Sequence, residues 1–60
     1  MIYKIVYKFP INDCYTSKGY VLFIKANNLR ELQDEFDIYV RDIKGAFIDR
    51  LKLLGKLEGV

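Results

Sequence analysis

The sequence predicts a small α+β fold with one layer of sheet and one helix, in the order hairpin, helix, strand. Lysines alternate with apolar residues in the runs 2–9 and 20–26, as they do in strands with one solvent-exposed face. An amphipathic helix with a capping sequence follows at 28–44. Sixty residues suffice for one domain, 1–60, with a small core.

The first predicted strand, 2–9, is rich in β-branched and aromatic residues, which favour strands. Successive side chains of a strand point to opposite faces, so Lys4 and Lys8 mark the solvent face. The side chains expected to face the core are Tyr3, Ile5, Tyr7 and Phe9. Pro10 ends the run because it has no N–H to donate to a neighbouring strand.

Turn-forming residues at 10–19 predict a hairpin connection to the second strand, 20–26. If Lys25 faces solvent, Val21 and Phe23 share that face with it. The inward side chains of this strand are then Tyr20, Leu22, Ile24 and Ala26.

The predicted helix, 28–44, begins with Asn28 as N-cap and with Glu31 three residues later, an arrangement similar to a capping box. Its apolar stripe, at steps of three and four residues, comprises Leu29, Leu32, Phe36, Val40 and Ile43. Lys44 and Gly45 indicate its end, since a cation in the last turn and a following glycine are typical of helix C-termini.

The tail, 47–57, has two interpretations. In one, a long C-terminal helix runs from Asn28 to Leu54 and gives a ββα fold, which the helix preference of leucine favours. In the other, alternation around Lys52 predicts a third strand with a bulge near Gly55. Its inward side chains are Leu51, Leu53 and Leu57. We favour the strand, because a lone hairpin is marginally stable, and a right-handed crossover places it antiparallel to a central first strand.

Charge is unevenly distributed along the chain. The net charge is +2, but residues 1–27 carry four lysines against one aspartate, and residues 28–44 carry five acidic residues against three basic ones. A basic sheet and an acidic helix are therefore expected. No stretch resembles a secretory signal or a membrane span, and the single cysteine suits a reducing compartment, so we expect a cytoplasmic protein without membrane contact.

No catalytic or metal-binding pattern is present. The chain has no histidine and one cysteine, Cys14, so it lacks the ligands of a zinc site and cannot form an internal disulfide. A reactive Cys14 thiol would need a nearby cation, and Lys18 is the nearest in sequence. We therefore expect neither an enzyme nor a cofactor, and interpret Cys14 as an ordinary loop residue.

The solvent face of the sheet is the candidate site. It combines cations with exposed apolar groups, a mixture typical of binding surfaces, and comprises Lys4, Val6, Lys8, Val21, Phe23, Lys25 and Lys52. We expect a protein-interaction module that regulates or inhibits a larger protein. Phages and mobile elements encode small accessory proteins of this kind. Its partner is then a larger protein or a second copy in a homodimer.

Two other interpretations remain open for this face. The lysines could hold nucleic acid, although only Phe23 is available there to stack on a base. The lysines could also serve only to keep the sheet soluble and its edges unpaired.

Overall fold

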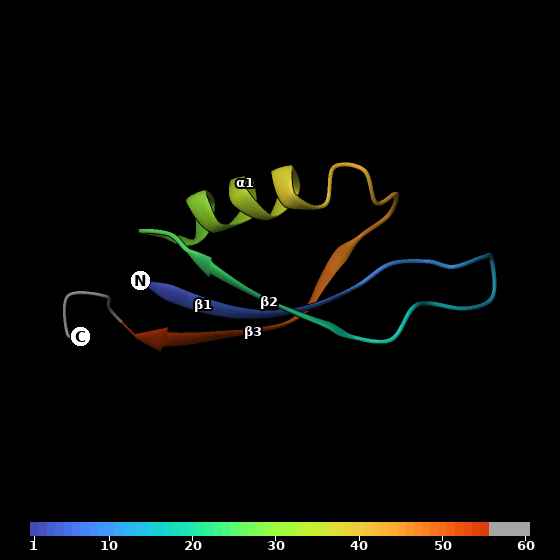
Figure 1. Ribbon diagram of the computed structural model, residues 1–60, viewed down its shortest axis with the longest axis horizontal. Coiled ribbons are helices and arrows are strands. Elements are labelled where there is room, and N and C mark those ends of the chain that lie inside the picture. Colours follow the sequence, from blue (N-terminus) through green and yellow to red (C-terminus); the bar gives the residue numbers. More distant parts are fainter. Residues whose placement is uncertain (56–60) are drawn as a thin grey trace.

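The computed structural model describes residues 1–55 of the chain. Its elements are, in order, β1 (Ile2–Lys8), β2 (Tyr20–Lys25), α1 (Leu29–Tyr39) and β3 (Phe47–Gly55). The strands form one sheet in the order β2-β1-β3, with β1 antiparallel to both neighbours, and α1 lies on one face (Figure 1). The α+β fold and the third strand are therefore confirmed, and the long C-terminal helix is wrong. The expectation for Leu57 lies outside the described residues.

The strand register confirms the two faces expected from the lysine alternation. Tyr3, Ile5 and Tyr7 are buried, and they pair with Ile24, Leu22 and Tyr20 on β2. On the other side, the same three residues pair with Leu53, Leu51 and Ile48 of β3. The pairing of β3 shifts at two places, next to Gly55 and again at Asp49. The first is the expected bulge, and the second has no counterpart in the sequence prediction.

The start of α1 is fixed by the predicted asparagine cap. The side-chain oxygen of Asn28 accepts a hydrogen bond from the backbone N–H of Glu31 at 2.9 Å. The Glu31 carboxylate in turn accepts one from the Asn27 side-chain amide at 3.3 Å. Such caps stabilise a helix by about 1 kcal/mol. The capped helix buries Leu32 and Phe36 in the core with the inward side chains of β1 and β2.

The helix is shorter than predicted, because it ends at Tyr39 rather than at Lys44. The segment after it contains Val40, Asp42 and Ile43, which are all poor helix formers. The backbone tightens there into a turn in which the N–H of Ile43 bonds to the carbonyl of Val40 at 2.8 Å. Ile43 still packs against the core from this turn, so the apolar spacing predicted its contact correctly and its conformation wrongly.

The helix covers β1 and β2 but leaves most of β3 uncovered, although Ile48 of β3 packs against the core. The core joins the inward side chains of β1 and β2 to Leu32, Phe36 and Val40. Leu51 and Leu53 lie on the helix side of the sheet as predicted, yet they are 44% and 52% exposed. Leu29, the first residue of the predicted stripe, is also exposed. Leu51 and Leu53 therefore face inward as predicted but stay outside the core, because α1 is offset towards β2. Leu29 belongs to the predicted stripe but is also outside the core.

Aromatic rings join the end of α1 to the sheet. The buried Tyr7 ring stacks on Tyr20 at 5.7 Å between ring centroids and meets the edges of Phe36 at 5.9 Å and Tyr39 at 6.3 Å. The Phe9 ring also stacks on the Tyr20 ring, with 5.7 Å between the ring centroids. Burial raises the pKa of Tyr7 above its ordinary 10.0, and the neighbouring phenols of Tyr39 and Tyr20 raise it further.

The raised pKa of Tyr7 predicts a loss of stability in alkali. Above pH 10, the unfolded chain releases the Tyr7 proton while the folded chain retains it, so the folded state binds more protons. The free energy of unfolding should therefore fall as pH rises from about 10. At lower pH, Tyr7 is protonated in both states and adds nothing to the pH dependence of stability. Urea titrations of the wild type and of Tyr7→Phe, compared across this range, measure the effect. An equal alkaline slope in both proteins would contradict it.

Candidate binding face

Two cross-strand rows define the outer face, by which we mean the face of the sheet turned away from α1. In the first row, Lys4 of β1 lies between Lys52 of β3 and Phe23 of β2. In the second row, Val6 lies between Arg50 and Val21. Cations thus occupy the β3 side of the outer face, and apolar groups occupy the β2 side.

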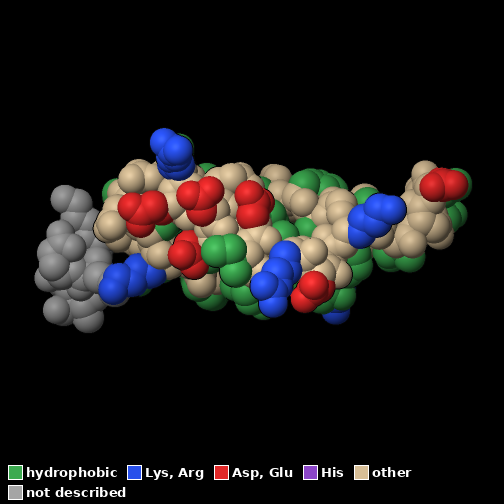
Figure 2. Space-filling model, turned by 90° about the horizontal axis from the view of Figure 1, so that it is seen from above, with side chains coloured by type: hydrophobic (Ala, Val, Ile, Leu, Met, Phe, Trp, Pro, Cys, Tyr) green, Lys and Arg blue, Asp and Glu red, His purple; other side chains and the backbone are tan. Residues whose placement is uncertain are grey.

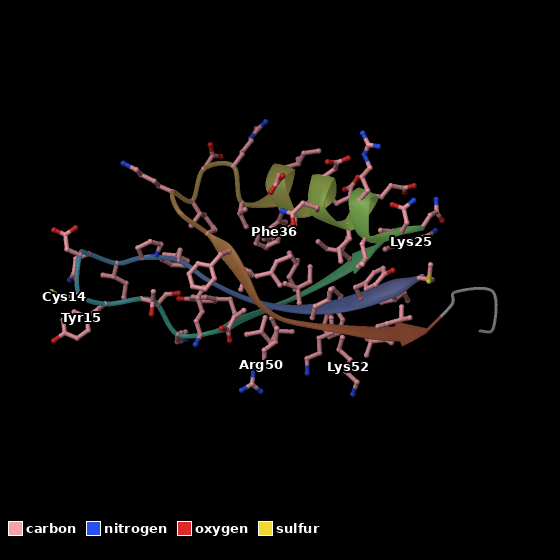
Figure 3. All side chains as sticks on the ribbon, turned by 180° about the vertical axis from the view of Figure 1, so that it is seen from behind. Cys14, Tyr15, Lys25, Phe36, Arg50 and Lys52 are labelled. Carbon is pink, nitrogen blue, oxygen red and sulfur yellow. The ribbon has the colours of Figure 1, made fainter. Side chains whose placement is uncertain are left out.

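The cations of these rows are close together and unpaired within the described part of the chain. Lys4 and Lys52 are directly opposite each other, and Arg50 is on the adjacent row of β3. No carboxylate among residues 1–55 lies within ion-pair distance of any of the three. Arg50 and Lys52 project from the sheet on the side away from α1 (Figure 3). Around them is an open hollow of about 370 Å³, lined by Lys4, Val6, Arg50, Leu51 and Lys52.

Lys8 differs from the other cations because it has an acidic partner. Its ammonium lies 3.6 Å from the carboxylate of Asp49, and both side chains are about one-third exposed. Asp49 is the extra residue where the pairing of β3 with β1 shifts, between Val6 and Tyr7 of β1. The ion pair offsets the charge of Lys8, so this end of the face is less basic than the sequence suggested.

Lys25 is separated from the cationic group. By register it shares the outer face, since it pairs with Ile2, but it is the last residue of β2. Its side chain lies beside the start of α1, away from Arg50 and Lys52 (Figure 3). There it lines a different hollow together with Phe23 and Glu35. The structure therefore gathers Lys4 and Lys52 but places Lys25 at another edge.

Arg50 and Phe47 also lie on the outer face, although they were not predicted there. Arg50 lies opposite Val6, and Phe47, 42% exposed, lies opposite Lys8. The alternation around Lys52 contained the signal for Arg50, because residues two apart in a strand share a face. Phe47 could not be placed in this way, since the bulge at Asp49 reverses the alternation before it.

The opposite side of the molecule is acidic, as expected from the charge distribution. Carboxylates gather over the exposed surface of α1 (Figure 2), and they belong to Glu31, Asp34, Glu35 and Asp37. The molecule is therefore polarised, with an acidic helix above a sheet whose outer face is basic. A molecule polarised in this way would be oriented by the electric field of any charged surface that it approaches.

The hairpin connection carries Cys14 at an exposed tip. The side-chain oxygen of Asn12 accepts hydrogen bonds from the backbone N–H groups of Cys14 and Tyr15, at 2.8 and 3.0 Å, and so shapes the turn. The ammonium of Lys18, the nearest cation in sequence, lies over the Tyr20 ring instead, 5.2 Å from its centroid. Within residues 1–55, no group of three potential metal ligands occurs.

No protein-family model, curated protein or solved structure matches the chain. The described part of the chain has no helix with the length and apolar character needed to cross a membrane.

Proposed function

We propose that this chain is a non-enzymatic protein-interaction module whose outer face binds an acidic, partly apolar surface of a larger protein. The observation that supports the proposal is the division of the face, with Lys4, Arg50 and Lys52 on one side and exposed Val21 and Phe23 on the other. Such a surface suits a regulator or inhibitor that occupies one site on its target.

The direct opposition of Lys4 and Lys52 supports an anionic partner. Like charges opposite each other on neighbouring strands destabilise a sheet by roughly 0.2–1 kcal/mol. Within residues 1–55 no acidic side chain relieves this repulsion. A carboxylate bound between the two ammonium groups would relieve the repulsion. The free protein is therefore less stable than it would be without the lysine pair, but the pair attracts an acidic surface.

The apolar half of the face favours a protein over a nucleic acid. Val21 and Phe23 are 56% and 59% exposed, and a valine side chain has no aromatic ring on which a base could stack. The two outward aromatic residues, Phe23 and Phe47, lie at opposite corners of the face. Phe23 on β2 is opposite Lys4 of β1, and Phe47 on β3 is opposite Lys8, so they are four residues apart along the strands and on the two edge strands. They are separated by roughly 17 Å, which is too far to hold neighbouring bases.

Lys4→Glu tests this proposal because its two effects have opposite signs. The substitution replaces the repulsion from Lys52 by attraction, so the free energy of unfolding should rise by about 0.5–1 kcal/mol. Binding to an acidic partner should weaken in the same protein. Thermal unfolding measures the first effect, and affinity capture from the source cells at low and high salt, followed by mass spectrometry, measures the second.

Lys44→Glu is the matched control, since it makes the same change of charge at an exposed position away from the sheet. It should retain the partner that Lys4→Glu loses. Equal retention of the partner by both variants would reject the outer face as the binding surface. Recovery of nucleic acid in place of a protein would establish the alternative function.

A further inference from the structure

The two edges of the sheet differ in their protection against pairing with another strand. β3 has two shifts in its pairing and carries Arg50 and Lys52. β2 pairs with β1 without any shift, and its only charged residue is Lys25 at its end. Bulges and charges are the usual means by which proteins block edge pairing. The outer edge of β2, which has no neighbour among residues 1–55, lacks both along most of its length.

Exposed apolar side chains flank this open edge. The hollow of about 440 Å³ that Lys25 and Glu35 line lies between β2 and the side of α1, and the rest of its lining is apolar and includes Leu22, Phe23, Ile38 and Tyr39. Ile38 and Tyr39 are 63% and 59% exposed, although they lie on the helix next to the sheet edge. An apolar surface beside an unprotected strand marks an interface.

The sequence of β2 is complementary to itself in the antiparallel direction. A two-fold axis at Leu22 would place Val21 of one copy opposite Phe23 of the other and Tyr20 opposite Ile24, with no like charges facing each other. Two copies of β3 could pair in the same way with the two-fold axis at Leu51, Arg50 or Lys52. These registers would place Arg50 opposite Lys52, Arg50 opposite its own copy, or Lys52 opposite its own copy. Repulsion therefore disfavours association of two copies through β3.

We propose that two copies of this chain associate through β2, antiparallel about a two-fold axis at Leu22, to form a continuous six-stranded sheet. Ile38 and Tyr39 line the same hollow as Leu22, so the side chains of both copies meet beside the axis. A stable interface buries about 800 Å² per partner, which is roughly one-sixth of the 4783 Å² surface of the chain. The exposed parts of Phe23 and Tyr39 alone supply roughly 180–300 Å².

The dimer would extend the binding face. A two-fold axis perpendicular to the sheet keeps both outer faces on the same side. Val21 and Phe23 of the two copies then form an apolar centre, and the cations Lys4, Arg50 and Lys52 of each copy flank it. The self-association involves β2 and α1 alone and does not depend on the identity of any partner.

A charge-swap experiment tests the two-fold register. One variant carries Val21→Glu with Phe23→Glu, and the other carries Val21→Lys with Phe23→Lys. Each variant alone opposes like charges across the axis, so its dimer dissociation constant should rise about 100-fold or more. An equimolar mixture opposes carboxylates to ammonium groups and should restore the dimer. Sedimentation equilibrium of the full chain without any partner gives the masses, and circular dichroism verifies that each variant is folded.

Leu53→Glu is the control, because it makes a similar change at an exposed apolar residue on the other edge strand. It should leave the dimer intact. The proposal is overturned by a wild type that stays monomeric up to about 1 mM, where an affinity of only about −4 kcal/mol would be detected. A dimer that persists in both double variants, a mixture that stays monomeric, or a dimer lost on Leu53→Glu would also overturn it.

Discussion

Phe36→Ala should leave the chain largely unfolded at 25 °C. Phe36 is 2% exposed and packs from α1 against β1, where its ring centroid lies 5.9 Å from that of Tyr7. Truncation of a buried phenylalanine costs about 3–5 kcal/mol. A single core in a domain of this size rarely supplies more than about 3–5 kcal/mol in total. Far-ultraviolet circular dichroism and urea titration measure the loss.

The matched control is Leu29→Ala on the same helix. Leu29 belongs to the predicted apolar stripe, yet it is 60% exposed in the structure. Its truncation should change the free energy of unfolding by no more than about 0.5 kcal/mol, as for other surface positions. If Leu29→Ala were as destabilising as Phe36→Ala, that result would contradict the exposed position of Leu29 on α1.

Gly45→Ala should destabilise the fold by about 2–4 kcal/mol, from two separate causes. Gly45 has a φ of +78°, a conformation that costs other L-residues roughly 1–2 kcal/mol. An added Cβ would also lie 2.8 and 2.9 Å from two carbons of the Pro10 ring, which is too rigid to move aside easily. Urea titration of the variant measures the combined effect.

A double-mutant cycle with Pro10→Ala separates the two causes. Removal of the proline ring relieves the contact with the new Cβ but leaves the backbone conformation unchanged. Gly45→Ala should therefore cost less in the Pro10→Ala background, with a coupling energy of about 1 kcal/mol or more. Additive effects of the two substitutions would show that a Cβ at position 45 does not clash with the Pro10 ring.

The local chemistry of the chain predicted most of the fold. Lys4 and Lys8 identified the outer face of β1, because the side-chain period of a strand is two. Asn28 and Glu31 located the start of α1 through a defined hydrogen bond. Gly45 was recognised as a breaking point, although its positive φ lies in the connection after the helix rather than at its cap.

The offset of α1 could not be predicted in this way. Alternation shows which face of a strand a side chain occupies, but it does not show whether another layer covers that face. Leu51 and Leu53 therefore lie on the predicted face and remain half exposed. Ile38 and Tyr39 were missed for a related reason, since they lie beside the regular apolar stripe and become significant only next to the open edge of β2.

The candidate binding face was predicted in its centre and missed at its margins. Lys4, Val6 and their partners on β2 followed directly from alternation. The ion pair of Lys8 with Asp49 depends on a bulge that brings the two side chains together, and the sequence pattern contains no sign of it. The position of Lys25 depends on where β2 ends relative to α1, which is a property of the packed structure.

The central position of β1 has a consequence for the order of folding. β1 can pair with β2 across a short connection, but Tyr3 meets Leu53 only after almost the whole described chain has folded back. Closure of the longer loop is entropically costlier and slower. Until β3 arrives, the most apolar strand has an unpaired side, and misassembly with other chains competes with completion of the sheet.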